Sequence, residues 1–196
     1  MNSHNNKTFF NEMAKDWNKN IPTINYEIAS SIIEIFQIGS ECSVLDVACG
    51  TGILYSILKD RNLSRYVGID ISQNMLEGFL YNYPYTDVRQ ADFESKVLLE
   101  KPFDYIILFN SIPHFNDLNA VFENAYNNLS IGGTFIIAHS KTRQGLKEHH
   151  ERIGHVPDKI DPIPSDELLL DCSKRYGFSD FNIIDEDYFC FSVSRK

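Results

Sequence analysis

The sequence predicts an α/β fold in which helices cover both faces of a doubly wound, mostly parallel sheet. Three observations lead to this prediction. Short apolar segments bounded by glycines alternate with helical patterns, the alternation repeats along most of the chain, and two adjacent strand-like segments end it. Short, nearly continuous apolar runs are typical of strands buried on both faces. We therefore expect a parallel sheet that closes with an antiparallel hairpin.

The elements follow in order along the chain. Residues 24–37 carry isoleucines at helical spacing, and Gly39 ends that helix. The next predicted elements are a strand over 43–48, a helix over 53–59, a strand over 66–70, a helix from Ser72 to about 81, a short strand over 87–90, a strand over 103–109, a helix over 118–129 and a strand over 134–138.

The alternation breaks at His139. Residues 140–164 are polar and contain three prolines, so we expect an insertion there. Ser165 caps a helix that ends near Gly177, and strands over 181–185 and 188–194 form the closing hairpin.

Length and composition limit the classes of protein to which this chain can belong. The 196 residues suit a single domain, and the four cysteines have no paired spacing. Lys and Arg number 18 against 27 Asp and Glu, and the resulting net charge of −9 argues against a broad nucleic-acid interface. We find neither a secretory signal nor an apolar run of the length of about 18 residues that a bilayer requires. We therefore expect a cytoplasmic protein with no nucleic-acid or membrane partner.

A strand that leads directly into a glycine loop is the most informative segment. Residues 44–52 read VLDVACGTG, and a helix follows. Glycines let the backbone approach a ligand closely, and a helix N-terminus attracts negative groups. A dinucleotide site begins similarly, but Tyr55 takes the place of its third glycine. Asp46 would repel a diphosphate and could hold a cationic amino group, which leaves an NAD(P)-dependent oxidoreductase as the weaker alternative.

This loop and four later segments resemble class I S-adenosylmethionine (SAM)-dependent methyltransferases of the small-molecule, type 11-like kind. VGIDIS at 67–72 resembles the end of the family's second strand, and QADF at 90–93 resembles the next loop. FDYII at 103–107 and LSIGGT at 129–134 resemble the fourth and fifth strands with their lead-ins. Five motifs in the family's order make the resemblance specific. It implies a Rossmann-like sheet of seven strands, SAM as cofactor and methyl transfer.

The resemblance also implies which residues bind the cofactor. Asp70 would hold the ribose hydroxyls, and Asn110 with Ser111 would face the methyl-bearing sulfur. The residues that would shape the methionine end are Asp46, Ala48, Cys49, Gly50 and Gly52. Those that would contact the adenine are Ile71, Met75, Asp92 and Phe93.

An aromatic segment near the N-terminus resembles the lid of many small-molecule methyltransferases. It runs from Phe10 to Trp17 as aromatic-x-x-x-Ala-x-x-aromatic. The two rings are seven positions apart, so we expect them to share a helix face. Trp17 would contact the cofactor and Phe10 the substrate, in a helical lid formed by residues 1–38. A helix that only packs on the domain is the alternative.

Histidines dominate the predicted substrate side. Ligands of open α/β sheets bind at the carboxyl ends of strands. His114 follows the fourth strand and His139 ends the fifth, so both are candidate general bases. Further candidate substrate contacts are Phe115, His149 and His150. His149 and His150 lie in the insertion at 140–164, which also contains His155. A metal site and a polar surface are the other interpretations; the spacing supports a metal weakly, and we expect none.

The predicted function is SAM-dependent methyl transfer to a small molecule by in-line displacement from the sulfonium. Residues 110–113 read NSIP and depart from the Asn/Asp-Pro-Pro-aromatic motif of nucleic-acid amino-methyltransferases. This departure favours a small-molecule acceptor. The alternative is a regulatory protein that binds SAM or a metal without transferring a methyl group.

Overall fold

The computed structural model describes residues 3–154 and 161–196. The strands are β1 (Ser43–Val47), β2 (Arg65–Asp70), β3 (Val88–Gln90), β4 (Phe103–Phe109), β5 (Leu129–His139), β6 (Phe178–Asp185) and β7 (Phe189–Arg195). The helices are α1 (Ser3–Met13), α2 (Thr23–Ile35), α3 (Ile53–Leu58), α4 (Gln73–Asn82), α5 (Leu118–Asn128), α6 (Arg143–Arg152) and α7 (Asp166–Arg175), with 3-10 helices η1 (Trp17–Asn20) and η2 (Ile112–His114).

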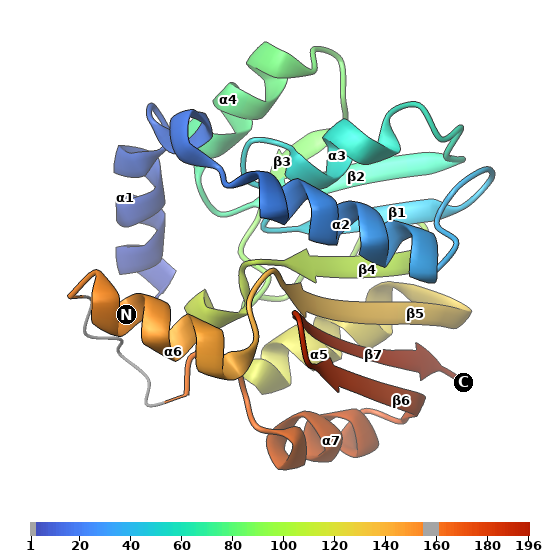
Figure 1. The fold of residues 1–196 in the computed structure, drawn as a ribbon. Helices are drawn as coiled ribbons and strands as arrows, with labels where there is room; N and C mark the ends of the chain where they lie inside the picture. Colours follow the sequence, from blue (N-terminus) through green and yellow to red (C-terminus); the bar gives the residue numbers. More distant parts are fainter. Residues whose placement is uncertain (1–2, 155–160) are drawn as a thin grey trace.

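The strands form one seven-stranded sheet in the order β3-β2-β1-β4-β5-β7-β6 (Figure 1). The pairs among β1 to β5 are parallel, whereas β7 runs antiparallel to both β5 and β6. The predicted doubly wound sheet with an antiparallel closing hairpin is confirmed.

Alternating side chains along β1 and β4 divide the core into two layers. Leu45 and Ile106 belong to the layer with α5 and α7, whereas Val44 and Ile107 belong to the layer with α2 and α3. Successive residues of a strand point to opposite faces of the sheet. The side chain of Asp46 therefore points to the same side as Val44, which decides its surroundings in the site described below.

Two strands begin earlier than the sequence predicts. β5 starts at Leu129, which pairs with Phe103 of β4. The register between β4 and β5 shifts after this pair, and Gly133 lies close to the β4 backbone there. A Cβ on Gly133 would lie 2.9 Å from the carbonyl oxygen of Phe103, so this glycine permits strand pairing where the sequence suggested a turn. β6 starts at Phe178, and its pairing with β7 shifts register between Ser179 and Asn182. This irregularity interrupts the alternation of apolar and polar residues, so the sequence predicts only the later part of the strand.

The insertion contains a helix that the sequence analysis did not assign. α6 begins after Thr142, whose side chain accepts a hydrogen bond from the backbone N–H of Gly145. Leu146 is its buried apolar residue, which explains why no helical stripe was evident. Ile163, farther along the insertion, is also buried in the core.

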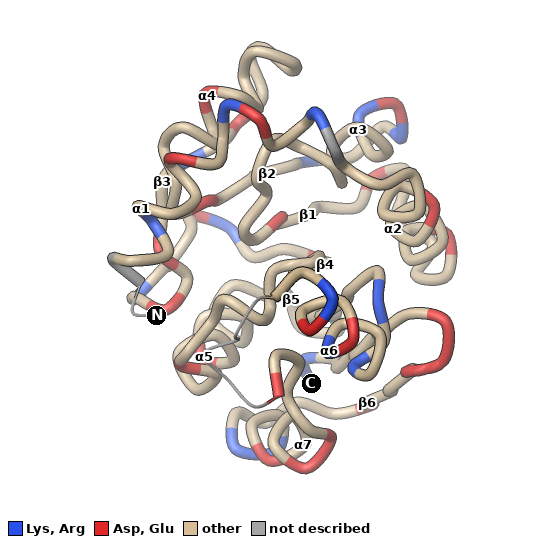
Figure 2. The backbone as a smooth tube through the Cα atoms, turned by 60° about the vertical axis from the view of Figure 1, so that its left-hand side comes forward, with Lys and Arg blue, Asp and Glu red and all other residues tan. Residues whose placement is uncertain are grey.

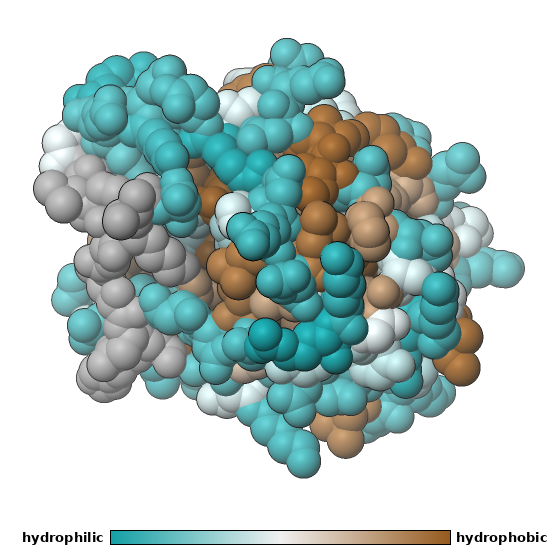
Figure 3. Space-filling model, turned by 90° about the horizontal axis from the view of Figure 1, so that it is seen from below, coloured by the Kyte–Doolittle hydropathy of each residue, from teal (hydrophilic) through white to brown (hydrophobic). Residues whose placement is uncertain are grey.

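The surface mixes apolar and charged residues. The view from the side of α7 and β6 shows apolar surface interrupted by hydrophilic side chains (Figure 3). Acidic and basic residues are interspersed along the traced chain (Figure 2). In the described ranges, every helix is too short or too polar to cross a membrane.

Candidate functional site

A cavity of about 450 Å³ lies at the carboxyl ends of β1, β2 and β4. Its wall combines the loop after β1, the ends of β2, β3 and β4, and the N-terminal elements α1 and η1. The predicted site residues that line it are Phe10, Trp17, Ala48, Cys49, Gly50, Asp70, Ile71, Met75, Asp92, Phe93, Asn110, Ser111, His114 and Phe115. Five separate sequence segments thus meet at one place, as the predicted site requires.

The glycine loop turns sharply through left-handed backbone conformations. Ala48, Gly50 and Gly52 have φ angles of 56°, 54° and 98°. A Cβ on Gly52 would lie 2.9 Å from a ring carbon of Phe79, so only glycine fits there. Gly50 faces the cavity, and the indole nitrogen of Trp17 lies 4.0 Å from the position of a Cβ on it. The loop therefore presents bare backbone to the space beneath the lid.

Aromatic rings fill the region behind this loop. The ring centroid of Tyr55 lies 4.7 Å from that of Tyr66, 5.5 Å from that of Phe79 and 5.2 Å from that of Tyr83. A dinucleotide site would use a glycine at the position of Tyr55 for close helix packing. Here the large side chain builds an aromatic cluster instead.

Asp46 lies under the glycine loop and outside the described cavity wall. The Tyr66 hydroxyl donates a hydrogen bond to its Oδ2 at 2.7 Å, and the Asp46 side chain is 2% exposed. Burial raises the pKa of Asp46 to about 7. Strand alternation explains the placement, because it directs Asp46 to the same side as Val44, the side of the sheet that α2 and α3 cover. The neighbouring Cys49 thiol also has a raised pKa through burial, so it stays protonated.

Asp70 is fixed at the cavity by two backbone donors. Its Oδ2 accepts the Gly50 N–H at 2.9 Å, and its Oδ1 accepts the Ser72 N–H at 2.8 Å. Burial raises the pKa of Asp70, whereas these hydrogen bonds act in the opposite direction. A carboxylate has about four acceptor positions, so lone pairs remain for a ligand's hydroxyl groups.

Two buried asparagines of α5 hold the loop that carries Asp92 and Phe93. Asn124 donates to the Phe93 carbonyl at 2.9 Å, and Asn128 donates to the Val97 carbonyl at 2.8 Å. The sequence analysis missed both. Their signal is a pair of amides four positions apart on the buried side of a predicted helix.

The ends of β4 and β5 are tied together at Asn110. Its backbone N–H donates to the Ala138 carbonyl at 2.9 Å, and its Oδ1 accepts the Ser140 N–H at 2.7 Å.

His139 is buried outside the described wall, where its Nδ1 accepts the Lys141 N–H at 3.0 Å. Burial lowers the pKa of His139 to about 4. The imidazole is therefore neutral at pH 7 and braces the turn behind Asn110.

His114 lies at the mouth of the cavity. Its exposed ring meets Phe10 edge-on, with centroids 4.9 Å apart. Its backbone carbonyl accepts a hydrogen bond of 2.7 Å from Asn6 of α1. Of the two histidines predicted as bases, His114 is the one that lines the cavity.

The lid is docked on the domain through asparagines. Asn11 Oδ1 accepts the Ser72 hydroxyl at 2.7 Å, and its carbonyl accepts from Asn74 Nδ2 at 2.9 Å. Thr51 of the glycine loop donates to Asn18.

The expectation that Phe10 and Trp17 share one helix face is wrong, because α1 ends at Met13 and Trp17 begins η1. The turn between them still brings the two rings to a centroid distance of 5.8 Å.

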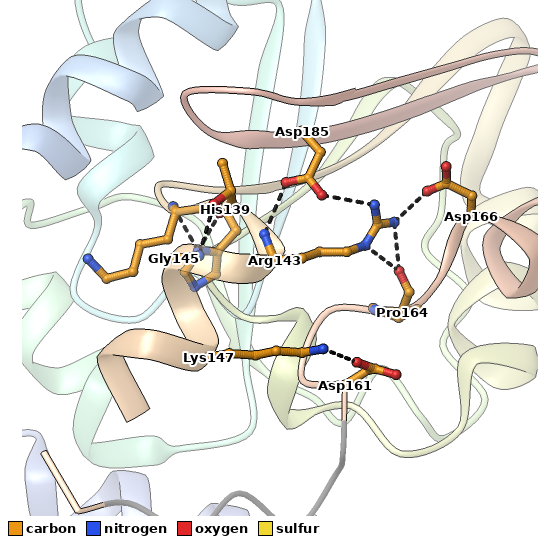
Figure 4. A network of polar contacts seen from close by, with 10 residues as sticks. His139, Arg143, Gly145, Lys147, Asp161, Pro164, Asp166 and Asp185 are labelled. Carbon is orange, nitrogen blue, oxygen red and sulfur yellow. Dashed lines mark hydrogen bonds and ion pairs between the residues drawn. The ribbon is translucent and has the colours of Figure 1, made fainter. Parts of the chain in front are cut away.

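Helix α6 is clamped beside the sheet (Figure 4). The Arg143 side chain bonds Asp185, Asp166 and the Pro164 carbonyl, and Lys147 pairs with Asp161 at 2.5 Å.

The described wall of the cavity does not include Gly52, His149 or His150. His155 lies outside the described residues. In the ranges that the structure covers, no group of three or more potential metal ligands occurs.

Comparison with known proteins identifies the domain. Residues 45–137 match the sequence model described as a methyltransferase domain. These residues of the chain are therefore a methyltransferase domain. No curated protein sequence matches it.

Solved methyltransferase structures share the fold over almost the whole chain. A Methanococcus maripaludis protein, provisionally described as a SAM-dependent methyltransferase, has a TM-score of 0.75 at 22% identity, covering 97% of this chain and 93% of that one. A SAM-dependent methyltransferase of Thermotoga maritima gives 0.72 at 17% identity, covering 98% and 99%. Magnesium protoporphyrin IX methyltransferase from Synechocystis PCC 6803, with bound S-adenosylhomocysteine (SAH), gives 0.73 at 14% identity, covering 100% of both.

The methyltransferase site fits SAM, the cofactor of this class. The bare backbone at Gly50 leaves room for a ligand against the loop, and Asp70 presents fixed acceptor oxygens at the end of β2. Met75 and Phe93 supply apolar wall to the cavity that Asp70 and Asp92 also line. The cavity thus offers fixed acceptor oxygens and apolar surface to such a ligand.

Proposed function

We propose that this methyltransferase transfers the methyl group of SAM to a small-molecule acceptor held between the lid and the end of β4. The observation that carries the proposal is that Phe10 and Trp17 of the lid share one cavity with Asp70 and Asn110. A cavity of about 450 Å³ is within the usual range for small-molecule sites. Residues 1–196 would act as one methyltransferase unit, with residues 1–38 as the lid.

The cofactor residues divide between the two ends of SAM. Asp70 would accept hydrogen bonds from the ribose hydroxyls, because its carboxylate is preset by two N–H donors. The adenine would lie between apolar and acidic wall residues, namely Ile71, Met75, Asp92 and Phe93. Ala48, Cys49 and Gly50 would contact the methionine end, near Asn110 and Ser111.

SAM supplies a methyl group on a positively charged sulfur when it is bound. The protein would orient the acceptor for in-line attack and exclude water by means of the docked lid. His114 would accept the acceptor's proton, since it lines the cavity mouth beside Phe10. Asp46 and His139 would act as positioning residues under the loop and behind Asn110, respectively.

Calorimetric titration with SAH, and with NADH in parallel, tests the cofactor assignment. We expect one SAH site per chain and no heat from NADH. Asp70→Ala should weaken SAH binding by about tenfold or more, as expected for lost hydrogen bonds to a charged group. The matched control is Asp60→Ala, whose side chain is 86% exposed on the surface. Binding of NADH, or unchanged SAH affinity in Asp70→Ala, would refute the proposal.

Transfer itself is tested with radiolabelled SAM and small-molecule acceptors of several classes. Methylated product should appear with the wild-type protein and decrease strongly in His114→Ala, while SAH affinity stays within about twofold. SAH binding without product from any acceptor would favour a regulatory SAM-binding protein instead.

A further inference from the structure

The amide of Asn110 has a fixed orientation. The Ser140 backbone N–H meets it at 2.7 Å, and a backbone N–H can only donate, so the atom that it meets is Oδ1. Ser140 is buried and lies outside the described cavity wall, whereas Asn110 is partly exposed and lines the cavity. The amide oxygen is thus directed away from the cavity, toward the turn after β5.

This orientation leaves Nδ2 as the polar side-chain atom of Asn110 that can meet a ligand. Within the part of the chain that the structure describes, it has no hydrogen-bond partner. The turn behind it is braced twice, because the Asn110 N–H bonds the Ala138 carbonyl and the Lys141 N–H bonds His139 Nδ1. The amide therefore cannot flip without losing the bond to Ser140. At the end of β4, Asn110 therefore presents a hydrogen-bond donor to the cavity.

The charge of the cavity wall restricts the ligand further. Four carboxylates line it, those of Asp16, Asp70, Asp92 and Glu94. Asp16 is paired with Lys19 at 2.5 Å, so the unpaired negative charge lies mainly at the ends of β2 and β3. A negatively charged acceptor would be repelled by these groups. An ammonium group suits the charge, but it has only donors and cannot accept a hydrogen bond from Asn110 Nδ2.

Aromatic rings contribute to the wall of the cavity that Asn110 lines. Phe10 and Trp17 contribute from the lid, and Phe109 and Phe115 flank the end of β4. Such a surface buries an apolar ring favourably.

We propose, on the basis of the function proposed above, that Asn110 determines acceptor specificity by donating a hydrogen bond to an uncharged oxygen of an aromatic acceptor. The oxygen belongs to a carbonyl or hydroxyl group, and the ring lies against the lid aromatics. Carboxylate and ammonium compounds of the same shape bind more weakly. This inference concerns the acceptor side alone, so it can fail while the SAM assignment stands.

Three ring-matched probes test the proposal on the SAH-saturated protein. They are benzamide, benzoate and benzylammonium, which differ in charge and hydrogen bonding. Titrations are followed by NMR of the ¹⁵N-labelled side-chain amides, and the signal pair missing in Asn110→Asp identifies Asn110. We expect benzamide to bind most tightly and to shift the Asn110 signals. Tighter or equal binding of either charged probe, no binding of benzamide, or no shift of the Asn110 signals would overturn the proposal.

The variant Asn110→Asp removes the donor and keeps the acceptor for Ser140. It should weaken benzamide binding by about tenfold, as expected for one lost hydrogen bond. Asn25→Asp is the matched control, because Asn25 lines the same cavity and the change adds the same charge. An equal loss in both variants would show that charge alone is responsible, and would contradict the proposal.

The cofactor is a competing partner for Nδ2. If Asn110→Asp weakens SAH binding but not benzamide binding, the donor serves the cofactor and the inference is wrong. If the wild-type protein does not bind SAH at all, the proposed function fails instead. Should Asn110→Asp not fold, the wild-type probe ranking still decides.

Discussion

The Tyr66 hydroxyl donates a hydrogen bond of 2.7 Å to Oδ2 of Asp46 beneath the glycine loop. The two residues come from adjacent parallel strands, since Val44 pairs with Tyr66 and Asp46 with Gly68. Burial raises the pKa of both groups, that of Asp46 to about 7. This carboxyl group is therefore largely protonated below neutral pH and supports the loop from behind.

Asp46→Asn should remove a pH dependence of folding stability. The pKa of Asp46 rises from 3.8 to about 7 on folding, so the folded state binds more protons between these values. Stability is then lost as the pH rises through this range, by an amount on the order of 4 kcal/mol. The asparagine oxygen still accepts from Tyr66 but does not titrate. Urea unfolding of both proteins from about pH 4 to pH 8 measures the difference, and parallel curves would disprove the assignment.

His139→Asn should change the pH dependence in the opposite direction. The pKa of His139 falls from 6.5 to about 4 on folding, so the unfolded chain binds more protons between these values. Stability is therefore lost as the pH falls from about 6.5 to about 4, by up to roughly 3 kcal/mol. Asparagine can accept the Lys141 N–H without titrating. His149→Asn serves as a control on an only partly buried helix position; an identical acid response of His139→Asn and wild type would contradict the prediction.

Asn11→Ala should loosen the lid. The change removes the acceptor of the Ser72 hydroxyl bond and of the weaker bond from the Asn74 N–H. We expect faster amide hydrogen exchange in α1 and SAH binding weakened by about threefold to tenfold. Glu12→Ala, an exposed neighbour on the same helix, should change neither. Unchanged exchange in Asn11→Ala would mean that other contacts hold the lid.

Gly52→Ala and Gly50→Ala should differ in their effect on stability. Both positions have positive φ, which costs a non-glycine residue about 1 kcal/mol. A Cβ on Gly52 would also collide with Phe79 and Tyr83 at 2.9 Å, so we expect a total loss of about 2–4 kcal/mol. Gly50 has its nearest neighbour at 4.0 Å and should lose only the first amount. Thermal unfolding of the two variants compares them, and equal losses would argue against the collision.

Local patterns were sufficient for most of the fold. The strand-like runs at 43–48 and 103–109 and the Ser72 cap correspond to β1, β4 and the start of α4. They were predictable because a buried parallel strand and a capped helix are encoded by neighbouring residues. Elements with long-range causes were not: Gly133 lies inside β5 because the Phe103 carbonyl is next to it, and α6 depends on the clamp at Arg143.

The sequence by itself determined the alternation of strands and helices, the glycine loop and the acidic residue at the end of β2, because each depends on residues close together in the chain. Only the tertiary structure decided how these groups are used. Asp46 turns to Tyr66, the lid rings meet across two helices, and Asn110 is oriented by Ser140 thirty positions away. The physical reason is that burial and hydrogen-bond partners set the charge and direction of a polar side chain, and both come from segments distant in sequence.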